Sequence, residues 1–221
     1  MNDSILATPI NKSISILELI SSGGTGGVII MSLLALLSIV AVFILFERYS
    51  AIQKASKEDE NFLKTIQNFV ESKDIEAAKT LCKNTNSPIS RMIEKGVNRI
   101  DKPMTDISSA IENQGKLEIY KMENNLANLA TIAGAAPMIG FLGTVIGMIV
   151  AFHEMANAGG NIDVELLSKG IYTAMTTTVA GLIVGIIAYI AYNFLVSKVD
   201  KVVFMLEAKT TEFLDLLHIN E

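Results

Sequence analysis

A cluster of threonines is the feature of this sequence that points most directly to chemistry. The stretch from Ile171 to Ser197 has no charged residue and contains Thr173, Thr176, Thr177 and Thr178. Most threonines in membrane helices donate to a backbone carbonyl three or four residues earlier, but four in six residues exceed what packing requires. We expect these hydroxyls to be offered to a proton, a water molecule or a carboxylate that moves along the helix.

The stretches that surround these hydroxyls carry no charge of their own. The segments Leu19–Phe46, Leu126–Phe152 and Ile171–Ser197 contain no Asp, Glu, Lys or Arg. A proton or ion path through a membrane usually needs an ionisable side chain. If this protein conducts ions, the titrating group must therefore belong to a partner.

Signals for other kinds of chemistry are poor. His153-Glu154 begins a zinc-protease-like pattern, but Asn157 stands where the second histidine would be. No Ser/His/Asp or Cys/His constellation is visible, so we predict no enzyme activity, no cofactor and no metal. The net charge of −5 comes without a basic patch, so a nucleic-acid partner is not expected. Cys82 is the only cysteine, which rules out a disulfide within the chain.

Two of the uncharged segments have a face made of small residues at helical spacing. In segment 126–152 this face is Ala133, Pro137, Gly140, Thr144, Gly147 and Ala151, and in segment 171–197 it is Ala174, Thr177, Gly181, Gly185 and Ala188, with Thr178 at its border. Small faces allow close packing of membrane helices, either between these two segments or between copies. Alternatively, they line an axial cavity that holds another helix or water, with Pro137, Gly140, Gly147, Gly181 and Gly185 as its small lining residues. Spacing alone favours neither interpretation.

The elements that carry these residues are predicted membrane spans. A hydrocarbon core of about 30 Å needs roughly 20 apolar residues in a helix, and all three uncharged segments are long enough. We predict an all-α integral membrane protein with spans at 28–46, 126–152 and 171–197, embedded in lipid. Spans two and three are expected to extend into a cytoplasmic helical domain.

Lysine and arginine positions give an orientation. Basic residues follow the first span, precede the second and follow the third, at Arg48, Lys54, Lys57, Lys116, Lys121, Lys198 and Lys201. The predicted layout is an outside N-terminal segment 1–27, a cytoplasmic helical domain 47–125, a short outside loop 153–170 and a cytoplasmic C-terminal helix 198–221. Segment 13–20 is predicted to form a short amphipathic helix. The glycine-rich run 21–27 should interrupt the helix before Val28.

The cytoplasmic part is expected to be helical throughout. Apolar periodicity predicts helices around 62–70, 75–81 and 89–100, with Pro88 suited to begin the third. From Met104 a helix should run without a break into the second span. After the third span an apolar stripe continues at Val199, Val202, Val203, Leu206, Thr210, Phe213, Leu214 and Leu217. That stripe needs a partner, either within the chain or in a neighbouring subunit.

Two motifs in these spans resemble a known family. Residues 136–148, APMIGFLGTVIGM, and residues 170–182, GIYTAMTTTVAGL, look like the second-span and third-span motifs of the ExbB/TolQ/MotA proton-channel family. Topology, length and the large first inside loop agree over nearly the whole chain. The resemblance is greatest to ExbB, with TolQ near it.

The resemblance implies a homo-oligomer, a pentamer, around a pore in the bacterial inner membrane. That pore would hold the single span of an ExbD- or TolR-like partner whose aspartate titrates, and the motion would pass to a TonB-like protein for outer-membrane transport. Thr144 and Thr178 match the family's pore threonines. The family often has a glutamate at the position of Thr173, so the partner's aspartate would be the only obvious titrating group here. A TolQ-like envelope motor, a gliding motor and a non-conducting membrane scaffold are the alternatives.

Overall fold

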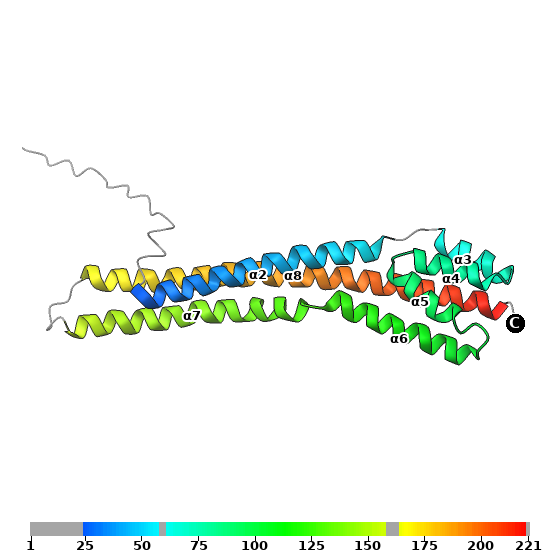
Figure 1. The fold of residues 1–221 in the computed structure, drawn as a ribbon. Coiled ribbons are helices and arrows are strands. Elements are labelled where there is room, and N and C mark those ends of the chain that lie inside the picture. Colours follow the sequence, from blue (N-terminus) through cyan, green and yellow to red (C-terminus); the bar gives the residue numbers. More distant parts are fainter. Residues whose placement is uncertain (1–23, 58–60, 158–163, 220–221) are drawn as a thin grey trace, which may run out of the picture. The chain divides into compact units, whose positions relative to one another are not determined.

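The computed structural model describes residues 24–57, 61–157 and 164–219, and its regular elements there are all helices, without a strand (Figure 1). The long helices are α2 (Gly24–Ser56), α7 (Leu126–Asn157) and α8 (Val164–Ile219). The shorter ones are α3 (Phe62–Glu71), α4 (Ile75–Asn84), α5 (Pro88–Val97) and α6 (Met104–Glu123). The amphipathic helix predicted at 13–20 lies outside the described residues.

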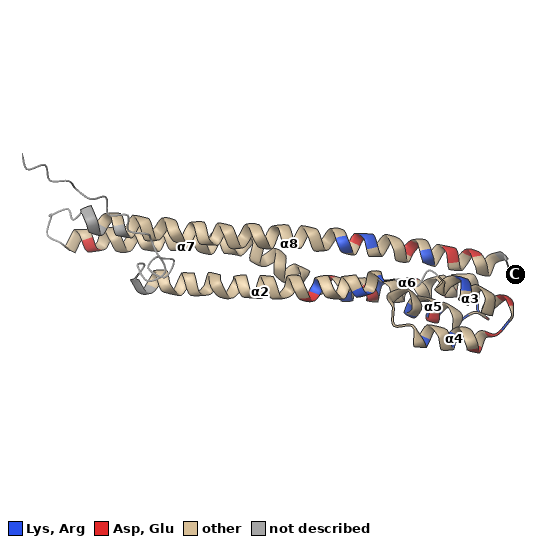
Figure 2. Ribbon diagram, turned by 90° about the horizontal axis from the view of Figure 1, so that it is seen from above, with Lys and Arg blue, Asp and Glu red and all other residues tan. Residues whose placement is uncertain are grey.

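Three stretches of helix are long and apolar enough to cross a membrane. They are Gly26–Ser56, Met104–Asn157 and Gly170–His218, and each contains one of the predicted spans. The all-α class and the three membrane-spanning helices are thereby confirmed. The chain is a multi-pass membrane protein. In the described part of α8, the charged side chains lie in the C-terminal portion, after the predicted span (Figure 2).

The chain divides into two compact units. The first comprises Met1–Ile39 and Ala133–Ile186, and the second comprises Val40–Ile132 and Ile187–Glu221. Since α2, α7 and α8 each pass from one unit to the other, every long helix contributes to both.

The first unit has a core made of aliphatic and small side chains. Ile30 and Leu34 of α2 are buried together with Ala136 of α7, and partly buried aliphatic residues of the three long helices pack around them. Large side chains such as Met138, Phe141 and Met175 are exposed. This arrangement suits helices in lipid, where small residues bring helices together and bulky apolar residues face outward.

The first helix begins earlier than predicted. The expected break over 21–27 is wrong for its last four residues, because Gly24–Gly27 are already helical. Tertiary contacts explain this: a Cβ at Gly26 would lie 3.3 Å from Ile146 Cγ2, and one at Gly27 would lie 3.4 Å from Thr173 Cγ2. These glycines allow α2 to approach its neighbours closely, which offsets their poor helix propensity.

The helices also extend into the segment predicted as a loop between spans two and three. α7 continues to Asn157 and α8 begins at Val164. Helical structure therefore takes up both ends of segment 153–170.

In the second unit, α4 and α5 begin at residues whose side chains cap the helix. Asp74 accepts a hydrogen bond of 3.0 Å from the backbone N–H of Ala77 at the start of α4. Ser87 and Ser90 form a reciprocal capping box at the start of α5, and Pro88 is the first helical residue as predicted. Such caps satisfy backbone donors that the first turn leaves without partners.

The predicted unbroken helix from Met104 into the second span is wrong at one point. α6 ends at Glu123, and α7 begins at Leu126. Asn125 has a φ of 64°, a left-handed conformation that asparagine tolerates better than most residues. The apolar periodicity continues across the break, which is why sequence reasoning did not detect it.

The apolar stripe at the end of α8 finds its partner within the chain. Leu206, Phe213 and Leu217 are buried. At Gly96 of α5 an added Cβ would lie 2.8 Å both from Ile111 Cδ1 of α6 and from Phe213 Cε1. α5, α6 and α8 therefore meet closely at Gly96, where a larger residue would require the side chains of Ile111 and Phe213 to shift.

Candidate functional site: the threonine contact between α7 and α8

The hydroxyls of Thr144 on α7 and Thr178 on α8 are hydrogen-bonded to each other. Both side chains are half-buried, and both belong to the first unit. The sequence placed these two residues in different spans, 34 positions apart. The fold thus brings together two hydroxyls from helices that are distant in the sequence.

The backbone carbonyl of Gly140 organises this contact. It accepts a hydrogen bond of 3.1 Å from Thr178 Oγ1 and one of 3.3 Å from Thr177 Oγ1. Thr144 Oγ1 lies 3.4 Å from the same oxygen and 3.4 Å from the carbonyl oxygen of Ala174. The threonine hydroxyls thus join the backbones of α7 and α8 as well as each other.

Glycines make this approach of backbones possible. A Cβ at Gly140 would lie 2.7 Å from the carbonyl oxygen of Thr177, and one at Gly181 would lie 2.6 Å from the carbonyl oxygen of Ala136. Contacts this short are not found for real Cβ atoms, so neither position accepts a side chain without moving a helix. The small faces of spans two and three therefore pack on each other within one chain.

The same close packing continues along both helices. Pro137 has no N–H, so the helical hydrogen bond to the carbonyl of Ala133 is missing. A Cβ at Gly185 would lie 3.0 Å from that carbonyl oxygen and 2.5 Å from Pro137 Cγ. Toward the other end, a Cβ at Gly147 would lie 3.1 Å from Ala174 Cβ. All five small residues predicted to line a pore thus lie at the α7–α8 contact, and a pore-lining role for them stays a prediction.

The remaining threonines of the cluster differ in their surroundings. Thr177 is 1% exposed and donates to the carbonyl of Ala174 at 2.8 Å. Thr176 donates to the carbonyl of Tyr172 at 2.9 Å, the ordinary pattern for a helical threonine. Thr173 is buried and faces Gly27 of α2. Among the threonines whose side chains the structure describes, Thr144 and Thr178 combine a hydroxyl–hydroxyl contact with partial exposure.

A pair of hydroxyls can do a limited set of chemical tasks. Each can donate one hydrogen bond and accept others, so the pair can bind water or either protonation state of a carboxyl group. Neither hydroxyl titrates near neutral pH. Among the described residues, no group of three or more His, Cys, Asp and Glu side chains could hold a metal ion. The arrangement suits the passage of a proton carried by another group.

A second polar cluster, which sequence reasoning missed, lies in the second unit. Arg48 of α2 is only 8% exposed, and its guanidinium donates to Glu47 Oε1 at 2.5 Å and to the backbone carbonyl of Lys121 at 3.1 Å. Asn125 Nδ2 donates weakly to Glu47 Oε2 at 3.4 Å. The charged residues that follow the first span thus not only indicate its orientation but also contact the break between α6 and α7.

Glu118 of α6 forms a third cluster, also missed. It is 2% exposed and accepts hydrogen bonds from Arg91 at 2.7 and 3.0 Å, from Gln114 at 2.7 Å and from Lys121 at 2.9 Å. Burial raises the pKa of Glu118, but these hydrogen bonds outweigh it, so the pKa lies below its usual value of 4.5. Gln114 and Lys121, four residues before and three after, were the available signal.

Comparison with known proteins identifies the family of this chain. Residues 84–208, more than half of the chain, match the MotA/TolQ/ExbB proton channel family. The matched region contains both motifs and both members of the threonine pair. The chain belongs to this family, whose members are membrane transport proteins rather than enzymes.

Individual relatives give the same result. The chain is 28% identical over 188 residues to a Methanothermobacter thermautotrophicus protein described as an ExbB homologue, covering 84% of this chain and 64% of the relative. It is 35% identical over 102 residues to the biopolymer transport protein ExbB of Aquifex aeolicus, covering 45% and 68%. It is 35% identical over 101 residues to the Tol-Pal system protein TolQ of Haemophilus influenzae, covering 46% and 44%. The alignment thus spans less than two thirds of the Methanothermobacter relative.

Proposed function

We propose that this protein is the ExbB-like subunit of a proton-driven motor in the bacterial inner membrane. In this proposal several copies, five in the arrangement that the family resemblance implies, surround the single span of an ExbD- or TolR-like partner. The N-terminus lies in the periplasm and the C-terminus in the cytoplasm. The motion passes to a TonB-like protein that acts on outer-membrane transport.

The observation that carries this proposal is the hydroxyl pair of Thr144 and Thr178 in spans without a charged side chain. The pair offers hydrogen bonds to a carboxyl group but cannot carry a proton away. A carboxyl on a partner span completes the path. One charge crossing the membrane releases ~2.3 kcal/mol per 100 mV, so work on a remote protein requires several steps.

The test is the double variant Thr144→Val and Thr178→Val, expressed with its partner. Valine keeps the branched shape and removes both hydroxyls, so the complex should assemble while uptake of a TonB-dependent iron complex is lost. Thr131→Val is the matched control, because Thr131 also lies in span two and its hydroxyl donates only to the carbonyl of Ala127. Normal uptake by the assembled double variant would contradict the proposal.

A second candidate is a non-conducting scaffold, which the tight contact of Gly140 with Gly181 favours. In a scaffold the small faces serve packing alone. The two candidates separate in proteoliposomes that contain the purified complex. A motor subunit lets protons through only with its single-span partner present, whereas a scaffold gives no flux with or without it.

A further inference from the structure

Large apolar side chains are exposed on two helices outside the predicted spans. In α3 to α6 and in α8 beyond Ser197, they are Leu117 at 56% and Tyr120 at 74% on α6, and Phe204 at 73% on α8. The other large apolar residues described in these helices are buried or half-buried. Exposed aromatic residues concentrated in one region, away from lipid, indicate a protein interface.

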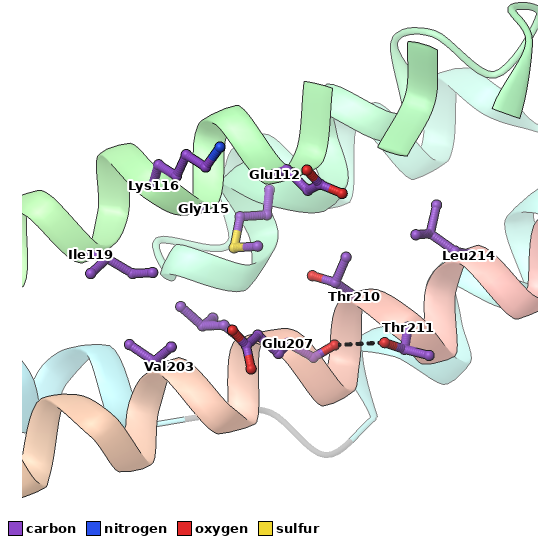
Figure 3. A pocket seen from close by; sticks show the side chains of 11 residues that line it. Glu112, Gly115, Lys116, Ile119, Val203, Glu207, Thr210, Thr211 and Leu214 are labelled. Atoms are coloured by element: carbon purple, nitrogen blue, oxygen red, sulfur yellow. Dashed lines mark hydrogen bonds between the residues drawn. The ribbon is translucent and has the colours of Figure 1, made fainter. Parts of the chain in front are cut away.

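The exposed residues of α6, Leu117 and Tyr120, lie beside the part of α8 that carries Phe204, so both sets have about the same height along the helix axes. Ile119 of α6 and Val203 of α8 line one cavity of about 410 Å³, and so do Lys116 and Glu207 (Figure 3). Tyr120 directly follows Ile119, and Phe204 directly follows Val203. With a rise of 1.5 Å per residue, the exposed residues on the two helices differ in level by no more than a few ångströms.

In a ring of identical membrane subunits, two surfaces that contact each other must lie at the same height along the membrane normal. Copies inserted in one orientation are related by rotation about an axis along the membrane normal, and rotation leaves height unchanged. In a ring of more than two copies each contact joins two different faces of the subunit. A face on α6 and another on α8 at one level satisfy both conditions.

The charges around the two groups are complementary. Beside Leu117 and Tyr120 are the lysines Lys116 and Lys121 with one acid, Glu123, which gives a net positive face. Beside Phe204 are Asp200 and Glu207 with one base, Lys201, which gives a net negative face. All six side chains are exposed. Opposite charges around apolar residues favour the joining of unlike faces over like ones.

We propose that α6 of one copy packs on α8 of the next copy, with Leu117 and Tyr120 against Phe204. The contact joins neighbouring subunits outside the membrane. It rests on the homo-oligomer of the proposed function and specifies the surfaces that form it.

The test is chemical cross-linking of a chain with Leu117→Cys and Phe204→Cys in native membranes, using a short bismaleimide. Because each copy presents one cysteine on each face, the products should form a ladder that reaches the full ring. Two separately tagged chains, one with each substitution, should give only cross-linked pairs that carry both tags. The native chain should give no product, because Cys82 is 1% exposed and burial, with Glu94 nearby, raises its pKa to about 12.

A matched control pairs Phe204→Cys with Ser72→Cys, which is exposed after α3 on the same unit. This pair should give at least tenfold less product of trimer size and above. Products that stop at dimers, no products, or products with another protein would each overturn the proposed contact. Uptake measured without the reagent separates the two proposals: uptake without a ladder contradicts this contact and leaves the motor function standing.

Discussion

Arg48 Nη1 of α2 donates a hydrogen bond of 3.1 Å to the backbone carbonyl of Lys121, in the last turn of α6. The last four carbonyls of a helix have no helical donor, so this guanidinium caps α6 at the place where the chain breaks before α7. Glu47 accepts a hydrogen bond from the same guanidinium and another from the side-chain amide of Asn125. The end of the first predicted span is thereby tied to the helix break.

Replacing Arg48 should loosen this connection. Arg48→Met leaves the carbonyl of Lys121 and Oε1 of Glu47 without the guanidinium donor, and we expect a loss of about 1–3 kcal/mol in stability. Arg48→Lys should lose less, because one ammonium retains part of the interaction. The measurement is thermal unfolding in detergent, with Lys54→Met as the exposed control from the same helix. An Arg48→Met variant as stable as the control would show that the cap contributes nothing.

The glycine contact between α7 and α8 gives a matched pair of substitutions. Gly181→Ala places a Cβ 2.6 Å from the carbonyl oxygen of Ala136, whereas Gly134→Ala meets nothing within 4 Å. We expect Gly181→Ala to separate the helices and lower the unfolding temperature by several degrees. Gly134→Ala should be neutral or slightly stabilising, since alanine is the better helix former. Equal unfolding temperatures for the two variants would mean that α7 and α8 do not pack this closely.

The Glu118 cluster makes stability depend on pH. Its pKa is lower in the folded protein than in the unfolded chain, so its contribution is complete above the ordinary value of 4.5 and is lost as pH falls through the lowered value. We expect the unfolding temperature to fall on acidification below about pH 4.5. Glu118→Gln should show a smaller fall over the same range. An unchanged pH dependence in Glu118→Gln would contradict this assignment.

Thr210 has a buried hydroxyl without a hydrogen-bond partner among the residues that the structure describes. It lines the cavity between α6 and α8, where its oxygen points toward the gap between the two helices (Figure 3). Since an unsatisfied buried hydroxyl costs about 1–3 kcal/mol, Thr210→Val should raise the unfolding temperature. Thr211→Val is the control, because its hydroxyl already donates to the carbonyl of Glu207 at 3.0 Å. A lower unfolding temperature for Thr210→Val would indicate that the hydroxyl has a partner in the assembled protein.

Local sequence signals were sufficient to predict much of the secondary structure of the second unit. Pro88 and the serines around it act through neighbours three residues away, so the start of α5 follows from the sequence. The break at Asn125 does not, because it depends on Arg48 and Glu47, more than 70 residues distant. The helical start at Gly24 likewise depends on contacts of α2 with Ile146 and Thr173.

The sequence by itself determined the three membrane spans, because length and absence of charge decide whether a helix is stable in hydrocarbon. It also determined which helix faces are small and where the hydroxyls lie, because helical periodicity is local. Only the tertiary structure showed that the two small faces pack on each other within one chain. Gly140 and Gly181 bring two backbones into contact within one chain and leave Thr144 and Thr178 hydrogen-bonded at the border. The close approach of two helices depends on how two distant segments fit together. The residue spacing within either segment cannot predict that fit.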